Sequence, residues 1–442
     1  MKDLDFIKDY IDRNEELFID LSMKIWNYAE LPYEEYKSAK LLQDILEDQG
    51  FTINKGLANI DTAFTASFGS GDPVFGFLGE YDALDKLSQK PEVTTKQAIK
   101  EGAPGHGCGH NLLGVGSLAA ALAVKEYLLT NNKEGRVIYF GCPAEEGNGS
   151  KQFMVADGVF DDVDFVYTWH PSTKNEVQSN RSVAIMGADF EFKGKSSHAG
   201  NSPHLGRSAL DAGELTSVGV NYLREHMEDQ ERVHYAYLDA GGISPNVVQD
   251  YCLVKYEVRA TTVKGLKVLF ERLVNVAKGA ALMTDTSLEY EIKMQFSDYI
   301  TNSALAKVAD QALKDIGPPD WDEKDYKLAR EYQKSYGDLN ENESLDSSIT
   351  SFDPNNKTYS SGSTDVGDVA YAVPTLNFYI ATACLGNIGH TWQMTGQSGS
   401  RIGNKGMLTA AKAMALSAIR TMDRDDIIKE AKGIVEKQRN AS

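Results

Sequence analysis

Residues 111–147 read NLLGVGSLAAALAVKEYLLTNNKEGRVIYFGCPAEEG, an apolar run of helical length followed by a short run of strand-forming residues. Residues 111–129 predict a helix, and residues 136–147 predict a strand that ends in a loop. The preceding run PVFGFLGEYDAL (73–84) is apolar enough to be a strand buried on both faces, and DFVYTWHP (164–171) predicts a further strand. Strands that alternate with helices in this way indicate an α/β fold with a mostly parallel sheet.

The character of the chain changes near residue 183, where VAIMGADFEFKG alternates apolar and polar residues like a strand with one wet face. The elements that follow predict the split βαβ pattern of a small, ferredoxin-like α+β domain. They are a helix at 208–228, strands at 233–241 and 252–260, a helix at 264–282 and a strand at 287–296. Edge strands of such a domain can pair across a dimer.

The α/β pattern resumes after about residue 298, with the strand TLNFYIA (375–381) and a closing helix at 405–423. A polar stretch at 317–363 is expected to be loop-like. We therefore predict a catalytic domain formed by residues 1–183 and 298–442, into which a lid or dimerisation domain of residues 184–297 is inserted.

The composition restricts the class of partner. The chain has 442 residues, a net charge of −19 and a pI near 4.9, so its field repels nucleic acids and anionic membrane surfaces. Its start alternates charged with apolar residues, unlike a signal peptide, and no run is expected to approach the length of a membrane-spanning helix. The four cysteines lie far apart without a Cys-x-x-Cys pair, which favours a reduced, cytoplasmic location.

The segment GAPGHGCGHN places Cys108 and His110 two residues apart among glycines, immediately before the predicted helix. A thiolate and an imidazole on such a loop can bind a divalent metal. A buried free cysteine beside a helix-capping loop explains the same segment equally well.

Glu145 and Glu146 follow the strand at 136–141, where open α/β sheets bind their ligands. Two adjacent glutamates there would send one side chain to a metal and leave the other beside water. A solvated acidic turn is the plain alternative. His170 ends the next strand and His390 follows a later one, although either histidine alone is more often structural.

Taken together, the motifs GHGCGHNLLG, PAEEG, the strand-terminal His170, SSHAG, SPNVV, EVRA and GSTDVGDV resemble the aminoacylase, carboxypeptidase-G and indole-acetyl-amino-acid hydrolase family. The match spans nearly the whole chain. Within the family, the resemblance is strongest to the branch of the p-aminobenzoyl-glutamate hydrolase B subunit and the β-alanyl dipeptidase-like proteins.

The resemblance implies two divalent metal ions per subunit, with Glu145 as general base and five ligands, namely Cys108, His110, Glu146, His170 and His390. Where the wider family has His-x-Asp, this chain has Glu80 and Asp82, which are left as residues outside the direct ligand set. Asn111 replaces an Asp of many relatives, so the residue that orients His110 is open. His106 matches no ligand position.

The resemblance also assigns substrate contacts in the inserted domain. His198 of SSHAG matches a histidine that acts on the reacting carbonyl, and it is expected to reach the partner chain of a homodimer. Asn246 and Arg259 match residues that contact the substrate's backbone or carboxylate. The Arg259 guanidinium suits this role because it can bind a carboxylate through two hydrogen bonds. Alone, His198 would be a surface histidine, and Arg259 would pair with a nearby acid.

The implied reaction is hydrolysis of the amide bond of a small N-acyl amino acid or dipeptide, because metal coordination lowers the pKa of water and Glu145 removes its proton. Zinc and manganese both remain open as the metal. The alternatives are an amidohydrolase with Cys108 as nucleophile and a non-catalytic, metal-stabilised binding protein.

Overall fold

The computed structural model describes residues 2–337, 343–360 and 362–441. Their contacts divide the chain into a larger unit, Met1–Asn180, Thr301–Lys357 and Val369–Ala441, and a smaller unit, Arg181–Ile300 and Thr358–Asp368. Segment 358–368 thus groups with the smaller unit, whereas the order of elements placed it in the catalytic domain. The domain boundaries at 183/184 and 297/298 stay a prediction.

The larger unit contains a seven-stranded sheet in the order β1-β2-β4-β3-β5-β11-β6. Its four adjacent strands β4, β3, β5 and β11 are parallel, and the strands outside them pair antiparallel. The predicted α/β class with a mostly parallel sheet is confirmed. The strands are β1 (Thr52–Lys55), β2 (Phe64–Ser70), β3 (Val74–Gly79), β4 (Gly135–Gly141), β5 (Phe165–Ser172), β6 (Glu176–Val177) and β11 (Thr375–Ala381).

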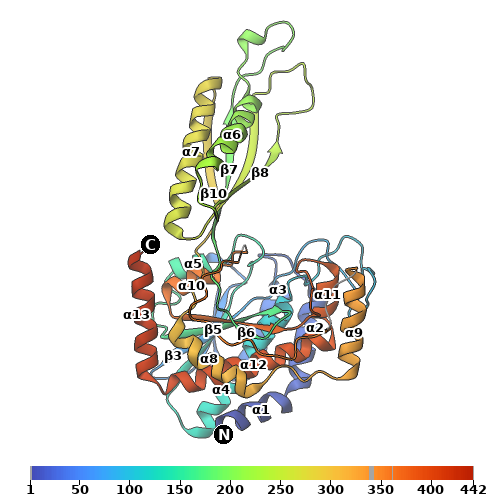
Figure 1. Cartoon of the computed structure of the whole chain (residues 1–442), viewed down its shortest axis with the longest axis vertical. Coiled ribbons are helices and arrows are strands. Elements are labelled where there is room, and N and C mark those ends of the chain that lie inside the picture. Colours follow the sequence, from blue (N-terminus) through green and yellow to red (C-terminus); the bar gives the residue numbers. More distant parts are fainter. Residues whose placement is uncertain (1, 338–342, 361, 442) are drawn as a thin grey trace. The chain divides into compact units, whose positions relative to one another are not determined.

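Helices α4 (His110–Asn131) and α12 (Arg401–Met422) pack against this sheet and against each other, and α1, α2 and α8 cover them, as Figure 1 shows. Buried leucines, alanines and aromatic residues from these elements form one continuous core. The other helices are α1 (Lys2–Arg13), α2 (Glu15–Tyr28), α3 (Tyr36–Asp48), α5 (Lys151–Ala156), α8 (Ser303–Ile316), α9 (Glu323–Ser335), α10 (Val366–Ala372), α11 (Trp392–Ser398) and α13 (Asp425–Ala441), with the short helix η1 (Leu57–Asn59).

Helix α4 corrects one expectation from the sequence. By length and composition it is apolar enough to cross a membrane, yet 83% of its most apolar window is buried inside the protein. The sheet and the neighbouring helices surround α4, so it is hydrophobic on all sides because it is a buried core helix.

The polar stretch at 317–363 is not uniformly loop-like, so that prediction is wrong for α9 (Glu323–Ser335). The side chain of Asp322 accepts hydrogen bonds from the backbone N–H groups of Lys324 and Asp325, and the Asp325 carboxylate accepts one from the N–H of Asp322. This capping box starts a helix within a polar sequence. Positions 338–342 and 361 of the stretch lie outside the described residues.

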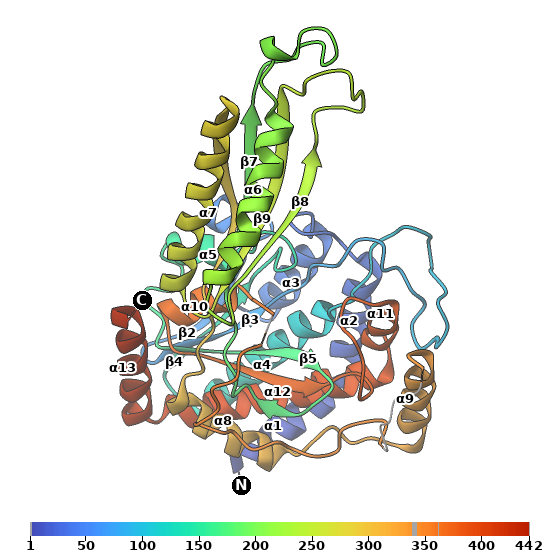
Figure 2. The same cartoon turned by 45° about the horizontal axis from the view of Figure 1, so that its top comes forward.

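The smaller unit is an antiparallel four-stranded sheet in the order β10-β7-β9-β8, with α6 and α7 on one face, as Figure 2 shows. The predicted α+β fold is confirmed, and the strand predicted at 287–296 matches β10 end to end. The elements are β7 (Ala184–Lys193), η2 (Pro203–Leu205), α6 (Ala209–Leu223), η3 (Arg224–His226), β8 (Arg232–Asp239), β9 (Tyr251–Ala260), α7 (Val263–Thr284) and β10 (Ser287–Phe296).

Candidate metal centre and active site

The candidate site lies where parallel strands of the larger unit end. Glu80 and Asp82 follow β3, and Glu145 and Glu146 follow β4, while His170 lies near the end of β5. His390 comes from the loop between β11 and α11, while His110 is the first residue of α4 and Cys108 lies in the loop just before it. Carboxyl ends of parallel strands meet at one edge of a sheet, which explains why residues so distant in sequence converge.

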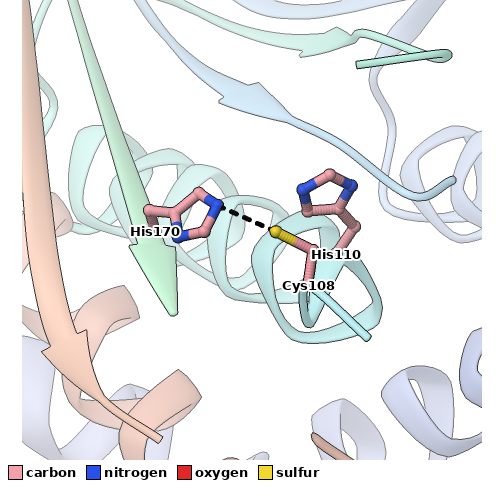
Figure 3. A group of neighbouring side chains, drawn as sticks. All are labelled: Cys108, His110 and His170. Atoms are coloured by element: carbon pink, nitrogen blue, oxygen red, sulfur yellow. Dashed lines mark hydrogen bonds between the residues drawn. The ribbon is translucent and has the colours of Figure 1, made fainter. Parts of the chain in front are cut away.

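The predicted ligands form two groups that share Cys108. One group joins Cys108, His110 and His170, and the other joins Cys108, Glu146 and His390, with the donor atoms in each within 4.8 Å of one another. Figure 3 shows the first group, in which the Cys108 sulfur lies 3.3 Å from His170 Nε2. In the second group, His390 Nε2 lies 3.2 Å from Glu146 Oε1.

Two of the histidines are held by their Nδ1 atoms. Nδ1 of His110 donates to Asp82 Oδ1 at 2.8 Å, and Nδ1 of His170 donates to the Pro171 carbonyl at 2.8 Å, because neither oxygen can donate. With the proton on Nδ1, the Nε2 atom of each neutral ring carries a lone pair that faces the site. Metal-binding histidines are typically oriented by such a hydrogen bond to a carboxylate or carbonyl.

Asp82 thereby supplies the orienting partner of His110 that the sequence left open. Its other oxygen accepts a hydrogen bond of 2.8 Å from the backbone N–H of Glu146, so one buried carboxylate fixes residues from two elements. Asn111 instead donates to Ser22 and to the Ser398 carbonyl. His106 is buried, with its Nε2 3.1 Å from the Ile25 carbonyl oxygen.

The two glutamates sit on a constrained turn. Ala144 before them has φ of 60°, a left-handed conformation that a residue with a side chain adopts at a cost. The backbone N–H of Ala144 donates to Glu35 Oε1 at 2.8 Å, and this carboxylate from outside the motif helps to hold the turn. Glu145 Oε2 lies 4.0 Å from His110 Nε2, and the Glu145 side chain is 12% exposed. No sequence pattern pointed to Glu35.

The electrostatics of the site favour cations. Burial, reinforced by the Glu146 carboxylate, raises the pKa of the Cys108 thiol well above its usual value. Burial by itself would raise the pKa of Glu146, but the nearby His390 and His110 outweigh it and lower the pKa to about 2. A buried thiol becomes a thiolate when a metal ion supplies positive charge beside it.

Three buried atoms at the site have no hydrogen-bond partner among the described residues, namely Glu80 Oε2, Glu146 Oε1 and His110 Nε2. Unsatisfied buried polar atoms are costly, and a cation bound among these three would satisfy them. The donors are one thiolate, imidazole nitrogens and carboxylate oxygens, a set that suits zinc or manganese. The residues present therefore fit divalent ions.

The predicted substrate residues lie in the smaller unit. His198 is exposed, and its Nδ1 accepts hydrogen bonds from the backbone N–H groups of Gly200 and Asn201, which places the proton of the neutral ring on Nε2. Asn246 is next to it, since its carbonyl accepts a hydrogen bond of 2.9 Å from the Ala199 N–H.

Arg259 lies on β9, where Nη1 donates to Ser363 Oγ at 3.3 Å and Nη2 lies 3.7 Å from Glu257 Oε2. Ser363 belongs to the GSTDVG segment noted in the sequence, so the structure joins two motifs that are distant in the chain. The ion pair with Glu257 matches the plain alternative for Arg259, and it leaves a role in substrate binding open.

Comparison with known proteins is consistent with this site. The family model of "Peptidase family M20/M25/M40" matches residues 76–329. The chain is 40% identical to the B subunit of p-aminobenzoyl-glutamate hydrolase of Escherichia coli K12, over 94% of this chain and 91% of that protein. It is 30% identical to the Xaa-Arg dipeptidase of Mus musculus, over 92% of this chain and 86% of that protein.

The fold is also that of solved structures. The chain is similar to the Bacillus subtilis YXEP protein, a dinuclear metal-binding peptidase from the M20 family, with a TM-score of 0.64 and 15% identity. That match covers 93% of this chain and 99% of the other. With a family match over more than half of its length and a relative at 40% identity, this protein belongs to peptidase family M20/M25/M40 and is a metal-dependent amidohydrolase.

Proposed function

We propose that the protein hydrolyses the amide bond of a small N-acyl amino acid or dipeptide, with Glu145 as general base. The observation that carries the proposal is the pair of donor groups sharing Cys108, with Glu145 within 4.0 Å of His110 at their edge. Cys108, His110, Glu146, His170 and His390 would hold two divalent ions.

Bound divalent ions would supply Lewis acidity and lower the pKa of water towards about 7. Glu145 takes the proton from the attacking water and later passes it to the departing amine, since its carboxylate is partly exposed beside the donor groups. The Nε2–H of His198 donates to the oxygen of the reacting carbonyl as negative charge develops there.

Arg259 and Asn246 would bind the carboxylate or backbone of the substrate. A guanidinium gives a charge-assisted grip on a carboxylate, and it would counter the field of a protein with net charge −19. The names of two relatives support an amino-acid leaving group, since one acts on p-aminobenzoyl-glutamate and the other is an Xaa-Arg dipeptidase. Substrates of p-aminobenzoyl-glutamate, β-alanyl or Xaa-Arg type are therefore the first to test.

Zinc and manganese are the proposed metals, zinc for the thiolate and manganese for the carboxylates. The dinuclear metal binding of the B. subtilis peptidase supports two ions. The cytoplasm is the proposed location, because four separate free cysteines suit a reducing compartment.

Two forms of assembly are compatible with the family. We propose a homodimer formed through edge strands of the smaller unit, in which β8 is largely exposed. The E. coli relative, however, is named as the B subunit of its hydrolase, so a partnership with a different chain is the second possibility. The mass of the native complex after expression alone separates these forms.

A thiol mechanism has less support. Burial raises the pKa of Cys108, which opposes formation of a nucleophilic thiolate without a metal. A binding protein without turnover would have no use for Glu145 in its present position.

The test is a hydrolysis screen of N-acyl amino acids, p-aminobenzoyl-glutamate, β-alanyl dipeptides and Xaa-Arg dipeptides, each with zinc and with manganese. We expect turnover of at least one class only in the presence of metal. Metal-independent turnover would favour the thiol mechanism, and no turnover of any class would favour the binding protein.

A further inference from the structure

A buried ion pair adjoins the donor groups. Lys151 Nζ lies 2.6 Å from Glu80 Oε1, and the two side chains are 0% and 2% exposed. Burying two charges costs several kcal/mol per ion before their attraction is counted, so the loss of one partner from such a pair changes the stability of the protein. Neither residue belongs to the set of five ligands or to the general base.

Both partners are attached to elements that build the site. Glu80 directly follows β3, two residues before Asp82, and Lys151 is the first residue of α5, after the loop that carries Glu145 and Glu146. The ion pair therefore connects the end of β3 to the first residue of α5, the helix that follows the loop with the two glutamates.

The second oxygen of Glu80 points at the metal-facing side of His110. Oε2 lies 3.3 Å from His110 Nε2, and Glu80, His110 and Glu145 offer donor atoms within 4.8 Å of one another. Among the described residues, neither Glu80 Oε2 nor His110 Nε2 has a partner in hydrogen-bond geometry. Nδ1 of His110 already donates to Asp82, so Nε2 faces Oε2 either with a proton or, when the ring is neutral, as a second acceptor that a metal ion must separate from Oε2.

We propose that Glu80 is a further metal donor, a sixth beside the five expected ligands, and that Lys151 is the residue that positions it. The ammonium occupies Oε1 and leaves only Oε2 for the ion, so Glu80 donates through one oxygen. Lys151 also offsets part of the negative charge of the crowded carboxylates Glu80, Asp82, Glu145 and Glu146. This inference rests on the proposed function only in requiring that the site bind divalent ions.

Three variants separate a metal donor from a purely structural ion pair, namely Glu80→Gln, Lys151→Met and the double variant Glu80→Gln/Lys151→Met. Each is measured for zinc affinity by chelator competition, for zinc per chain after dialysis, and for the unfolding midpoint of the metal-free protein. The double variant matters most, because replacing both members of a buried pair with neutral groups of similar shape restores stability.

We expect Glu80→Gln to weaken the binding of one zinc by at least about tenfold, because a neutral amide is a poorer metal donor than a carboxylate. Lys151→Met should destabilise the metal-free protein and weaken zinc binding less than Glu80→Gln does, since the Glu80 carboxylate remains but is no longer held by the ammonium. The double variant should recover the unfolding midpoint and still bind zinc at least about tenfold more weakly.

The control is Asp325→Asn, which removes another buried carboxylate of the larger unit, paired with Lys405 and Arg401. It should lower stability and leave zinc binding unchanged. A double variant that binds zinc as tightly as the unmodified protein would overturn the inference and leave the proposed function standing. An unmodified protein that binds no zinc and no manganese would overturn both.

Discussion

Glu35 and Ala144 are joined by a hydrogen bond of 2.8 Å from the Ala144 N–H to Glu35 Oε1. The other oxygen of Glu35 accepts a hydrogen bond from the Thr62 hydroxyl at 3.1 Å, and the side chain is fully buried. Because Ala144 is in the left-handed region and directly precedes Glu145, this contact stabilises the turn that presents the proposed general base. Glu35 is thus a positioning residue, distant in sequence from the site.

The Glu35 carboxylate makes stability depend on pH. Burial and the nearby Asp82 raise the pKa of Glu35 from 4.5 to about 7. The folded state then holds a proton that the unfolded state has released, so stability falls as pH rises from about 4.5 to about 7. Glu35→Gln abolishes this loss, and from pH 5 to pH 8 the variant should gain on the order of 2 kcal/mol relative to the unmodified protein. Urea unfolding of both metal-free proteins measures the difference, and identical pH profiles would contradict it.

Cys108→Ser should weaken metal retention, because a neutral hydroxyl replaces the thiolate that the two donor groups share. Chelators should inactivate the unmodified protein, and added zinc or manganese should restore it. Cys252→Ser is the matched control, since Cys252 is buried in the smaller unit. Full activity in a preparation verified to be metal-free would rule out the metal mechanism.

Arg259 should confer a requirement for a free carboxylate on the leaving amino acid. Amidation of that carboxylate is expected to lower kcat/KM by on the order of a hundredfold, and Arg259→Gln should remove most of this preference. Arg232, which faces Arg259 across the β8–β9 pair, is the control position because its guanidinium bonds backbone carbonyls nearby. Equal rates for free and amidated substrates would leave Arg259 with a structural role alone.

Much of the architecture could be predicted from the sequence, because strand and helix periods differ and the motifs lie at strand ends. The convergence of Glu146 and His170 followed from one rule, that parallel strands present their carboxyl ends at a single edge. The strand at 287–296 was predicted from its alternation and is β10.

The contacts that tune the site could not be predicted in this way. Glu35 reaches Ala144 across 109 positions of the chain, and Lys151 meets Glu80 only because β3 and the start of α5 adjoin. No periodicity records such pairs, since each depends on side-chain directions in the folded protein. The helix α9 was missed because its polar residues hid a capping signal at Asp322.

The proposed homodimer yields a complementation prediction. If His198 serves the metal site of the partner chain, coexpression of Glu145→Gln and His198→Ala chains should give heterodimers with one site carrying both defects and one carrying neither. Differential tags isolate these heterodimers, and about half of the unmodified activity should return. Heterodimers as inactive as both parent variants would mean that His198 serves its own chain. A native mass equal to that of one chain would rule out the homodimer.

The most direct test of the central proposal pairs metal content with turnover in Glu145→Gln, using Glu146→Gln as the adjacent control. We expect Glu145→Gln to keep its metal while kcat falls by about a hundredfold or more, as loss of a general base requires. Glu146→Gln should instead lose metal, because its oxygen belongs to the donor group with Cys108 and His390. A Glu145→Gln protein that keeps both its metal and most of its turnover would contradict the mechanism.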